Sequence, residues 1–103
     1  MRIAVKAGVD VGFVEAVLTR EDATRVVREL APLPLVLNLP TNGATPNFTN
    51  AEALEMGFKI TWHPIAGAVA AVHALRRAYR DVMEKGTDVS TAEGMGPREF
   101  FQG

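Results

Sequence analysis

Three short hydrophobic runs recur along the chain at nearly even intervals. They are residues 11–14 (Val-Gly-Phe-Val), 35–37 (Leu-Val-Leu) and 60–62 (Ile-Thr-Trp). Each is rich in β-branched, aromatic or leucine residues and is bounded by Gly, Pro or Asn, which is typical of buried β-strands. Runs of this length also fit a segment of a buried helix, so the residues between them decide the interpretation.

The residues between the first two runs predict an amphipathic helix. Thr19 is a good N-cap residue, and Asp22 stands where a capping box places an acid, although Glu is preferred there. Pro32 and Pro34 end the helix. Its apolar residues fall at helical spacing and form one stripe, made of Ala23, Val26, Val27 and Leu30.

Two further helices follow the second and third runs. Thr49 and Glu52 have the spacing of a capping box, and Gly57 fits the position just after a helix. A longer helix is predicted over residues 66–85, and residues 2–7 predict the final turns of another. The long helix has one apolar face, made of Val69, Val72, Leu75, Tyr79, Val82 and Met83.

The alternation of strands and helices predicts an α/β fold of three consecutive parallel βα units, because strands joined through helices pair by right-handed crossovers. Three strands cannot close a barrel, and a (β/α)₈ barrel takes about 250 residues, whereas the chain has 103. We therefore expect a partial (β/α)₈ TIM barrel that either associates or belongs to a longer chain. Residues 1–87 hold the units, and residues 88–103 form a tail that fits one short helix.

Composition narrows the class of protein. Hydrophobic residues make up 48% of the chain, enough for a packed core, and the net charge of −1 favours neither nucleic acid nor a membrane surface as a partner. The absence of Cys excludes disulfides, a thiol nucleophile and Cys-based metal sites. No apolar run reaches the roughly 18 residues of a membrane span, and no signal peptide is evident, so a cytoplasmic location is expected.

Three polar residues fall at the carboxyl ends of the predicted strands, where parallel α/β folds place their active sites. Glu15 follows the first run, Asn38 ends the second and His63 ends the third. By alternation, Glu15 shares the face of Phe13, and Asn38 shares the face of Val36. A carboxylate, a carboxamide and an imidazole on one rim would suit a small polyanionic substrate. The alternatives are a carboxylate bonded to backbone amides, a turn-forming amide and a packed or solvated imidazole.

The segment after the second run, residues 38–49, is a polar loop of turn-forming residues. It is long for a βα connection, and such loops carry binding residues more often than other segments do. We therefore add Thr41 and Asn42 to Asn38 and His63 as candidate substrate-binding residues. The alternative is an ordinary surface loop.

Five segments in order match the pattern of one enzyme superfamily. They are residues 8–15, 34–38, 43–46, 54–60 and 66–87. The first resembles a strand with a Gly-Ala-Asp-hydrophobic-Glu pattern, and the second and third resemble the next strand and its substrate loop. The fourth resembles the approach to the final strand of the barrel, and the fifth resembles the long helix that follows that strand. These features are those of the isocitrate lyase/phosphoenolpyruvate mutase superfamily, and the resemblance covers most of the chain.

The resemblance implies a (β/α)₈ barrel of which the chain holds the C-terminal part, the sixth to eighth strands. Such enzymes are typically tetramers with the last helix swapped between subunits. With Mg²⁺ they cleave or rearrange C–C or P–C bonds of small 2-oxo or 2-hydroxy acids. By resemblance, Glu15 is catalytic and contacts the substrate or its metal-bound water, and Asn38 contacts a carboxylate. The metal ligands and the Cys-containing loop of the lyases belong to earlier strands, and Pro40, Thr41 and Asn42 stand where lyases usually carry a glutamate.

Three functions remain open from the sequence. The first is part of a Mg²⁺-dependent lyase or mutase-like enzyme for a small carboxylic-acid substrate, inactive without the missing N-terminal strands. The second is a non-catalytic relic that acts as an oligomerisation or binding module. The third is a small enzyme that uses Glu15, Asn38 and His63 in a new oligomeric site. The expected protein partner is a second copy of the chain or the missing barrel half.

Overall fold

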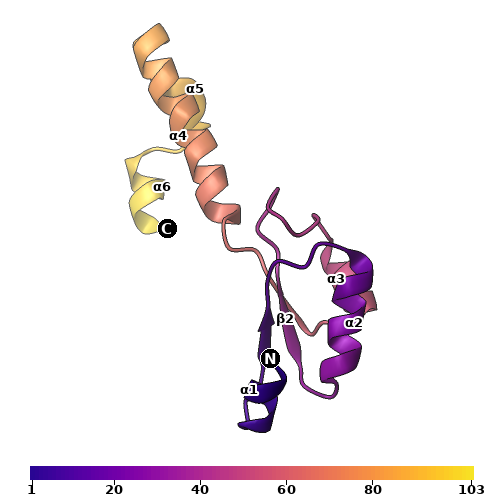
Figure 1. Cartoon of the computed structure of the whole chain (residues 1–103). Helices are drawn as coiled ribbons and strands as arrows, with labels where there is room; N and C mark the ends of the chain where they lie inside the picture. Colours follow the sequence, from indigo (N-terminus) through magenta and orange to yellow (C-terminus); the bar gives the residue numbers. More distant parts are fainter. The chain divides into compact units, whose positions relative to one another are not determined.

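A three-stranded parallel sheet lies at the centre of residues 1–66, with the strands in the order β1-β2-β3. In the computed structural model, which describes residues 1–103, the strands are β1 (Gly12–Val14), β2 (Leu35–Asn38) and β3 (Ile60–Trp62) (Figure 1). β2 pairs with both neighbours in parallel. The predicted strands and the three consecutive parallel βα units of a partial barrel are confirmed.

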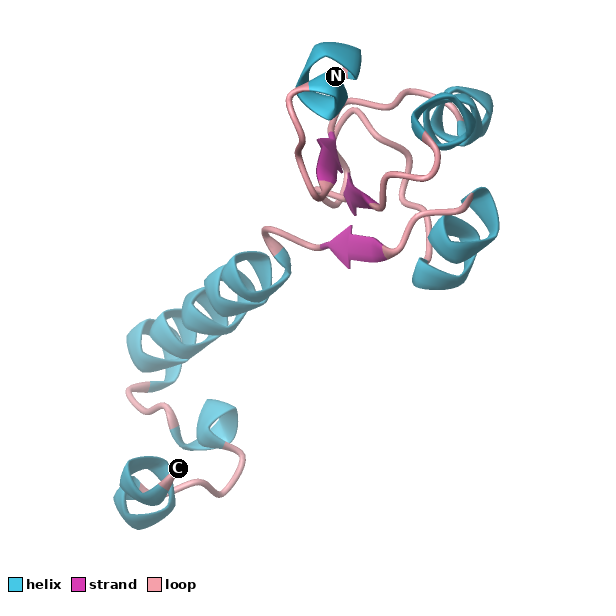
Figure 2. Cartoon of the chain, turned by 90° about the horizontal axis from the view of Figure 1, so that it is seen from below, coloured by secondary structure: helices cyan, strands magenta, loops and turns pink.

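Three helices belong to this part of the chain, namely α1 (Arg2–Lys6), α2 (Arg20–Leu30) and α3 (Asn50–Met56). Figures 1 and 2 show α2 and α3 side by side on the same face of the sheet. Their starts are capped as the sequence predicts. The hydroxyl of Thr19 accepts a hydrogen bond from the backbone N–H of Asp22 at 3.0 Å, and Thr49 forms a complete capping box with Glu52.

The core lies between the sheet and these two helices. Leu35, Leu37 and Val14 of the strands are at most 4% exposed and pack in one cluster with helix residues such as Ala23 and Ala53. Apolar residues of both helices at helical spacing therefore meet the alternate residues of the strands, which is how βα units bury their faces.

The opposite face of the sheet is left uncovered within residues 1–66. Successive strand residues point to opposite faces, so Phe13, Val36, Ile60 and Trp62 lie away from the helices. Phe13, Ile60 and Trp62 are 47%, 48% and 55% exposed. Parallel sheets are normally covered on both faces, and in a closed barrel this one would be the inner face.

Residues 67–103 form the second unit. Its helices are α4 (Ala66–Lys85), α5 (Val89–Ala92) and α6 (Pro97–Gln102), the last at the place of the predicted short helix. The hydroxyl of Ser90 donates to Asp81 at 2.6 Å and Lys85 lies 3.1 Å from the same carboxylate. The Ser90 hydrogen bond, and after it Lys85, lower the pKa of Asp81 below its ordinary value. The boundary near residue 87 stays a prediction.

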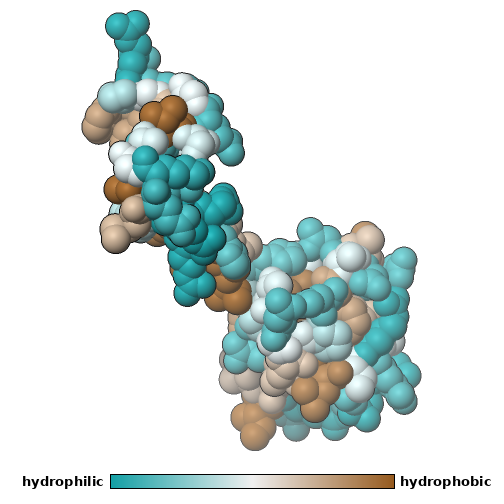
Figure 3. Space-filling model, turned by 90° about the horizontal axis from the view of Figure 1, so that it is seen from above, coloured by the Kyte–Doolittle hydropathy of each residue, from teal (hydrophilic) through white to brown (hydrophobic).

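The apolar stripe of α4 is largely exposed. No residue of this helix is buried, and the stripe from Val69 to Met83 is between 42% and 84% exposed. Figure 3 shows hydrophobic residues, in brown, at the surface of both units. None of the helices combines the length and the hydropathy that crossing a membrane requires.

Gly57, which closes α3, gives a first test of this packing. Its φ is +101°, and a Cβ placed there would lie 2.7 Å from Cγ1 of Val27 on α2. We expect Gly57→Ala to lower the free energy of unfolding by about 2 kcal/mol, from left-handed strain together with overpacking. The matched control is Gly8→Ala, at φ +89° with nothing within 4 Å, which should lose about 1 kcal/mol from strain alone. Equal losses in urea unfolding would contradict the predicted contact with Val27.

Candidate functional site

Glu15 and Asn38 meet at the carboxyl end of the sheet. Nδ2 of Asn38 donates a hydrogen bond to Oε1 of Glu15 at 3.3 Å. The register pairs Val14 with Leu37, so the residues that follow them lie level on neighbouring strands. Because Val14 and Leu37 point into the core, alternation puts Glu15 and Asn38 on the uncovered face. The structure thus brings together the two residues singled out on the first two strands.

The amide of Asn38 is only partly satisfied. Its Oδ1 atom is buried and has no hydrogen-bond partner. The orientation of the amide follows from Glu15, because an ionised carboxylate only accepts hydrogen bonds and must face the NH₂ group. Buried acceptors are nearly always bonded in folded proteins. Asn38 therefore holds a buried acceptor that no group of this chain satisfies.

His63 does not join this pair. Its Nε2 lies 2.9 Å from Oδ1 of Asn50 on α3, an atom that also accepts a hydrogen bond from the hydroxyl of Thr61 at 2.9 Å. In the register, Trp62 is the residue opposite Asn38, so His63, one residue further, turns to the helix side. The structure therefore joins Glu15 to Asn38 by a hydrogen bond and leaves His63, at the end of β3, bonded to Asn50 instead. The substrate-binding role of His63 stays a prediction.

Trp62 was missed by the sequence reasoning. It is 55% exposed and shares the face of Asn38 on the neighbouring strand. The signal that finds it is the alternation within the third run, because Ile60 and Trp62 must share a face when Thr61 occupies the other.

The loop after β2 is held by its own amide groups. The backbone N–H of Asn42 donates a hydrogen bond to Oδ1 of Asn47 at 2.9 Å. In return, Nδ2 of Asn47 donates to Oδ1 of Asn42, also at 2.9 Å. Asn42 has a φ of +59° within a turn closed by Gly43 N–H on the carbonyl of Pro40 at 2.9 Å. Thr41 is exposed. The loop is therefore pre-formed, and the pairing of Asn47 with Asn42 was not predicted.

A cleft of about 480 Å³ borders Glu15 on the side away from Asn38, at the unpaired edge of β1. Ion pairs cross its lining, with Arg2 at 3.1 Å from Glu29 and Arg25 at 2.6 Å from Asp22. In a longer barrel the preceding βα unit would fill this space. We therefore assign the cleft to the fold and not to a ligand.

Residues 1–103 contain no cluster of three or more His, Cys, Asp or Glu side chains that could hold a metal ion. Glu15 is the only carboxylate among the five candidate residues, and Asn38 and His63 add at most neutral ligands on opposite faces. The residues of this chain do not by themselves fit the Mg²⁺ site that the superfamily resemblance implies.

The capping box at the end of the loop makes stability depend on pH. The hydrogen bond from the backbone N–H of Thr49 lowers the pKa of Glu52 below its ordinary value of 4.5, and the charge of Arg20 adds to this. The stabilisation is present above the unfolded pKa and is lost as the pH falls through the lower folded pKa. We expect the urea midpoint of the wild type to fall more steeply below about pH 4.5 than that of Glu52→Gln. Glu21→Gln, on the exposed start of α2, is the control, and parallel wild-type and Glu52→Gln curves would contradict the prediction.

Comparison with known proteins relates these features to a family. No family model matches the chain. The 2-methylisocitrate lyase of Aeropyrum pernix is 31% identical over 100 residues, which are 97% of this chain and 32% of that protein. The chloroplastic carboxyvinyl-carboxyphosphonate phosphorylmutase of Arabidopsis thaliana is 29% identical over 101 residues, 98% of this chain and 30% of that protein. The crystal structure of 2,3-dimethylmalate lyase, a PEP mutase/isocitrate lyase superfamily member, matches with a TM-score of 0.90 and 42% identity. The resemblance to the isocitrate lyase/phosphoenolpyruvate mutase superfamily is confirmed.

The match covers only part of these superfamily members. The chain spans about a third of the length of the curated relatives, and 98% of it matches 34% of the 2,3-dimethylmalate lyase chain. Three βα units are a similar share of an eight-unit barrel. The lyase and mutase relatives therefore support a partial barrel of this superfamily, while the assignment to its sixth to eighth strands stays a prediction.

Proposed function

We propose that the chain forms part of the active-site rim of a Mg²⁺-dependent lyase or mutase. The reaction would cleave or rearrange C–C or P–C bonds of small 2-oxo or 2-hydroxy (di)carboxylic acids, and the chain would be inactive without the remaining strands. The observation that carries this proposal is the Glu15–Asn38 pair at the carboxyl end of the uncovered face. Barrel enzymes hold their substrates at that end.

The chemistry of the pair suits a 2-hydroxy or 2-oxo acid. Glu15 uses one oxygen on Asn38, and its remaining lone pairs can accept a hydrogen bond from a substrate hydroxyl or a water molecule. Asn38 donates one N–H to Glu15 and keeps a second N–H for a carboxylate oxygen. A 2-hydroxy acid offers a donor and an acceptor on adjacent carbon atoms, which matches this arrangement.

Thr41, Asn42 and His63 complete the proposed substrate-binding set. Thr41 and Asn42 stand on the pre-formed loop that follows Asn38. His63 would act from the helix side, where its Nε2 lies 2.9 Å from the side-chain Oδ1 of Asn50. A bound divalent cation would act as a Lewis acid toward the substrate, with ligands from strands outside residues 1–103.

The uncovered sheet face and the exposed apolar stripe of α4 support the proposal that the chain binds a protein partner. Phe13, Ile60 and Trp62 leave about half of each side chain exposed on one sheet face, and both edge strands lack a second neighbour. We assign this face to the missing barrel half. The exposed stripe of α4 supports association of further copies as a homo-oligomer.

A chimaera tests the proposal. In it, this chain replaces the matching third of the Aeropyrum pernix 2-methylisocitrate lyase. We expect Mg²⁺-dependent turnover of 2-methylisocitrate, 2,3-dimethylmalate or oxaloacetate by the chimaera and none by the 103-residue chain alone. A chimaera that assembles like the parent lyase and turns over none of these acids would overturn the proposed reaction. Turnover by the isolated chain would overturn its proposed inactivity and favour the third function, a new oligomeric site.

The alternative function, a non-catalytic oligomerisation or binding module, is favoured by the same exposed faces. Sedimentation velocity and intact mass of the chain purified from its source distinguish the two. A longer intact polypeptide excludes the relic, and a stable oligomer of 103-residue chains excludes the simple fragment. A cytoplasmic location stays a prediction in both cases.

A further inference from the structure

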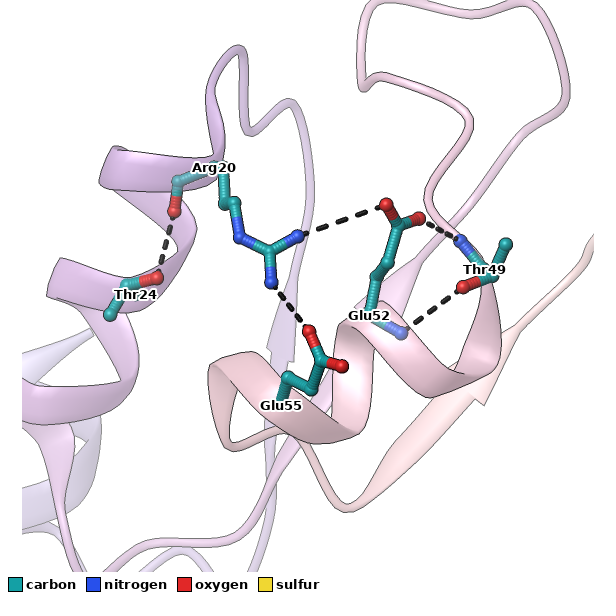
Figure 4. Close-up of polar contacts among 5 residues, drawn as sticks. All are labelled: Arg20, Thr24, Thr49, Glu52 and Glu55. Carbon is teal, nitrogen blue, oxygen red and sulfur yellow. Dashed lines mark hydrogen bonds and ion pairs between the residues drawn. The ribbon is translucent and has the colours of Figure 1, made fainter.

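Arg20 connects the two helices that follow the candidate site. It is the first residue of α2, five positions after Glu15, and Thr24 fixes its backbone by donating a hydrogen bond to its carbonyl at 2.9 Å. Its guanidinium reaches across to α3, with Nη2 at 2.8 Å from Oε2 of Glu55 and Nη1 at 3.8 Å from Oε1 of Glu52 (Figure 4).

Glu52 in turn forms hydrogen bonds to Thr49, at the end of the loop. Its other carboxylate oxygen accepts the backbone N–H of Thr49 at 2.7 Å, and the hydroxyl of Thr49 accepts the N–H of Glu52 at 3.1 Å. Thr49 is the last residue of the loop that begins after Asn38. Figure 4 shows the contacts running without a break from Arg20 through Glu52 to Thr49.

The two βα loops are therefore joined at both ends. Glu15 and Asn38 join them where the strands end, at 3.3 Å. Near the starts of the helices, the 3.8 Å contact of Arg20 with Glu52 joins them, and the 2.8 Å contact with Glu55 in the last turn of α3 holds the guanidinium in place. We infer that Arg20 is a positioning residue that holds the candidate substrate loop, residues 39–49, in register with Glu15. This role rests on the proposed function for its catalytic meaning, but the link itself is a property of this chain.

The shape of the guanidinium explains why Arg suits position 20 better than Lys. Arg presents a planar fork of donors that can serve two carboxylates at once, whereas the ammonium of Lys is a single point charge. The side chains of Arg20, Glu52 and Glu55 are 49%, 42% and 67% exposed. Ion pairs this exposed add little to global stability, so the expected effect is on the position of the loop and not on folding.

Amide hydrogen exchange of the chain, read by NMR, tests the link directly. In Arg20→Met, we expect the amide protons of Thr49 and Asn42 to exchange about fivefold faster. The reason is that local opening of the loop no longer costs the free energy of breaking the ion pairs of Arg20. The matched control is Arg25→Met, also on α2, whose guanidinium pairs only within that helix, with Asp22. Its loop amides should exchange at the wild-type rate, and both variants should keep the wild-type urea midpoint.

A conservative variant and the kinetics complete the test. Arg20→Lys keeps the positive charge beside Glu52 and Glu55 without the planar fork, so it should restore slow exchange in part. In the chimaera, Arg20→Met should raise the KM more than it lowers the kcat, since a displaced loop weakens substrate binding. Identical exchange in Arg20→Met and Arg25→Met would overturn the positioning role. An inactive chimaera with the expected exchange pattern would overturn the proposed function and leave the Arg20 link standing.

Discussion

Replacing Glu15 with Gln is expected to abolish most of the activity of the completed enzyme. A positioned carboxylate that accepts a proton or orients a water molecule contributes about 10²–10⁴-fold to the rate, and we expect the kcat of the chimaera to fall by this factor. Gln keeps the size of Glu and an oxygen that can accept the hydrogen bond from Asn38, now 3.3 Å long. The loss should therefore come from the charge and not from a rearranged site.

Steady-state kinetics of the chimaera with saturating Mg²⁺ measure this effect. Glu21→Gln removes an equally sized carboxylate from the outer helix α2 and should leave the kcat within about twofold, since exposed surface substitutions are usually neutral. Circular dichroism of both variants checks that they fold alike. A Glu15→Gln chimaera as active as the Glu21→Gln control would remove Glu15 from the catalytic machinery and would leave the superfamily assignment intact.

The fold was predictable because its signals are local. The hydrophobic runs, the caps at Thr19 and Thr49, and Gly57 with its φ of +101° each act within a few residues of chain. Even spacing then implies parallel crossovers, since few topologies join strands through helices. The Glu15–Asn38 pair was accessible for the same reason, because alternation places residues after paired strands on one face.

The rest of the site depends on contacts between elements, which local patterns do not encode. His63 was assigned to the rim from its place at a strand end, but its side chain turns to Asn50 because Trp62 takes the position opposite Asn38. The loop pairing of Asn47 with Asn42, and the reach of Arg20 to α3, join residues whose separation follows no helix or strand period. These contacts need the three-dimensional placement of both partners.

The core of the three units is small, so one side chain can decide whether it is stable. Leu37 stands in the central strand, is 0% exposed and belongs to the cluster that joins the sheet to α2 and α3. No partner chain is needed to bury it, in contrast to Phe13 and Trp62 on the uncovered face. The helix-facing side should therefore be ordered before any barrel is completed.

Leu37→Ala is accordingly expected to lower the free energy of unfolding of the isolated chain by about 3 kcal/mol, from lost burial together with the cavity left behind. Urea unfolding followed by circular dichroism measures the change. Leu54→Ala, the same substitution on α3 at a side chain that is 67% exposed, should change the free energy by less than about 0.5 kcal/mol. A loss in Leu37→Ala no larger than that of Leu54→Ala would mean that the helix-facing core forms only when the missing strands are present. The isolated chain would then depend on its partner for folding as well as for catalysis.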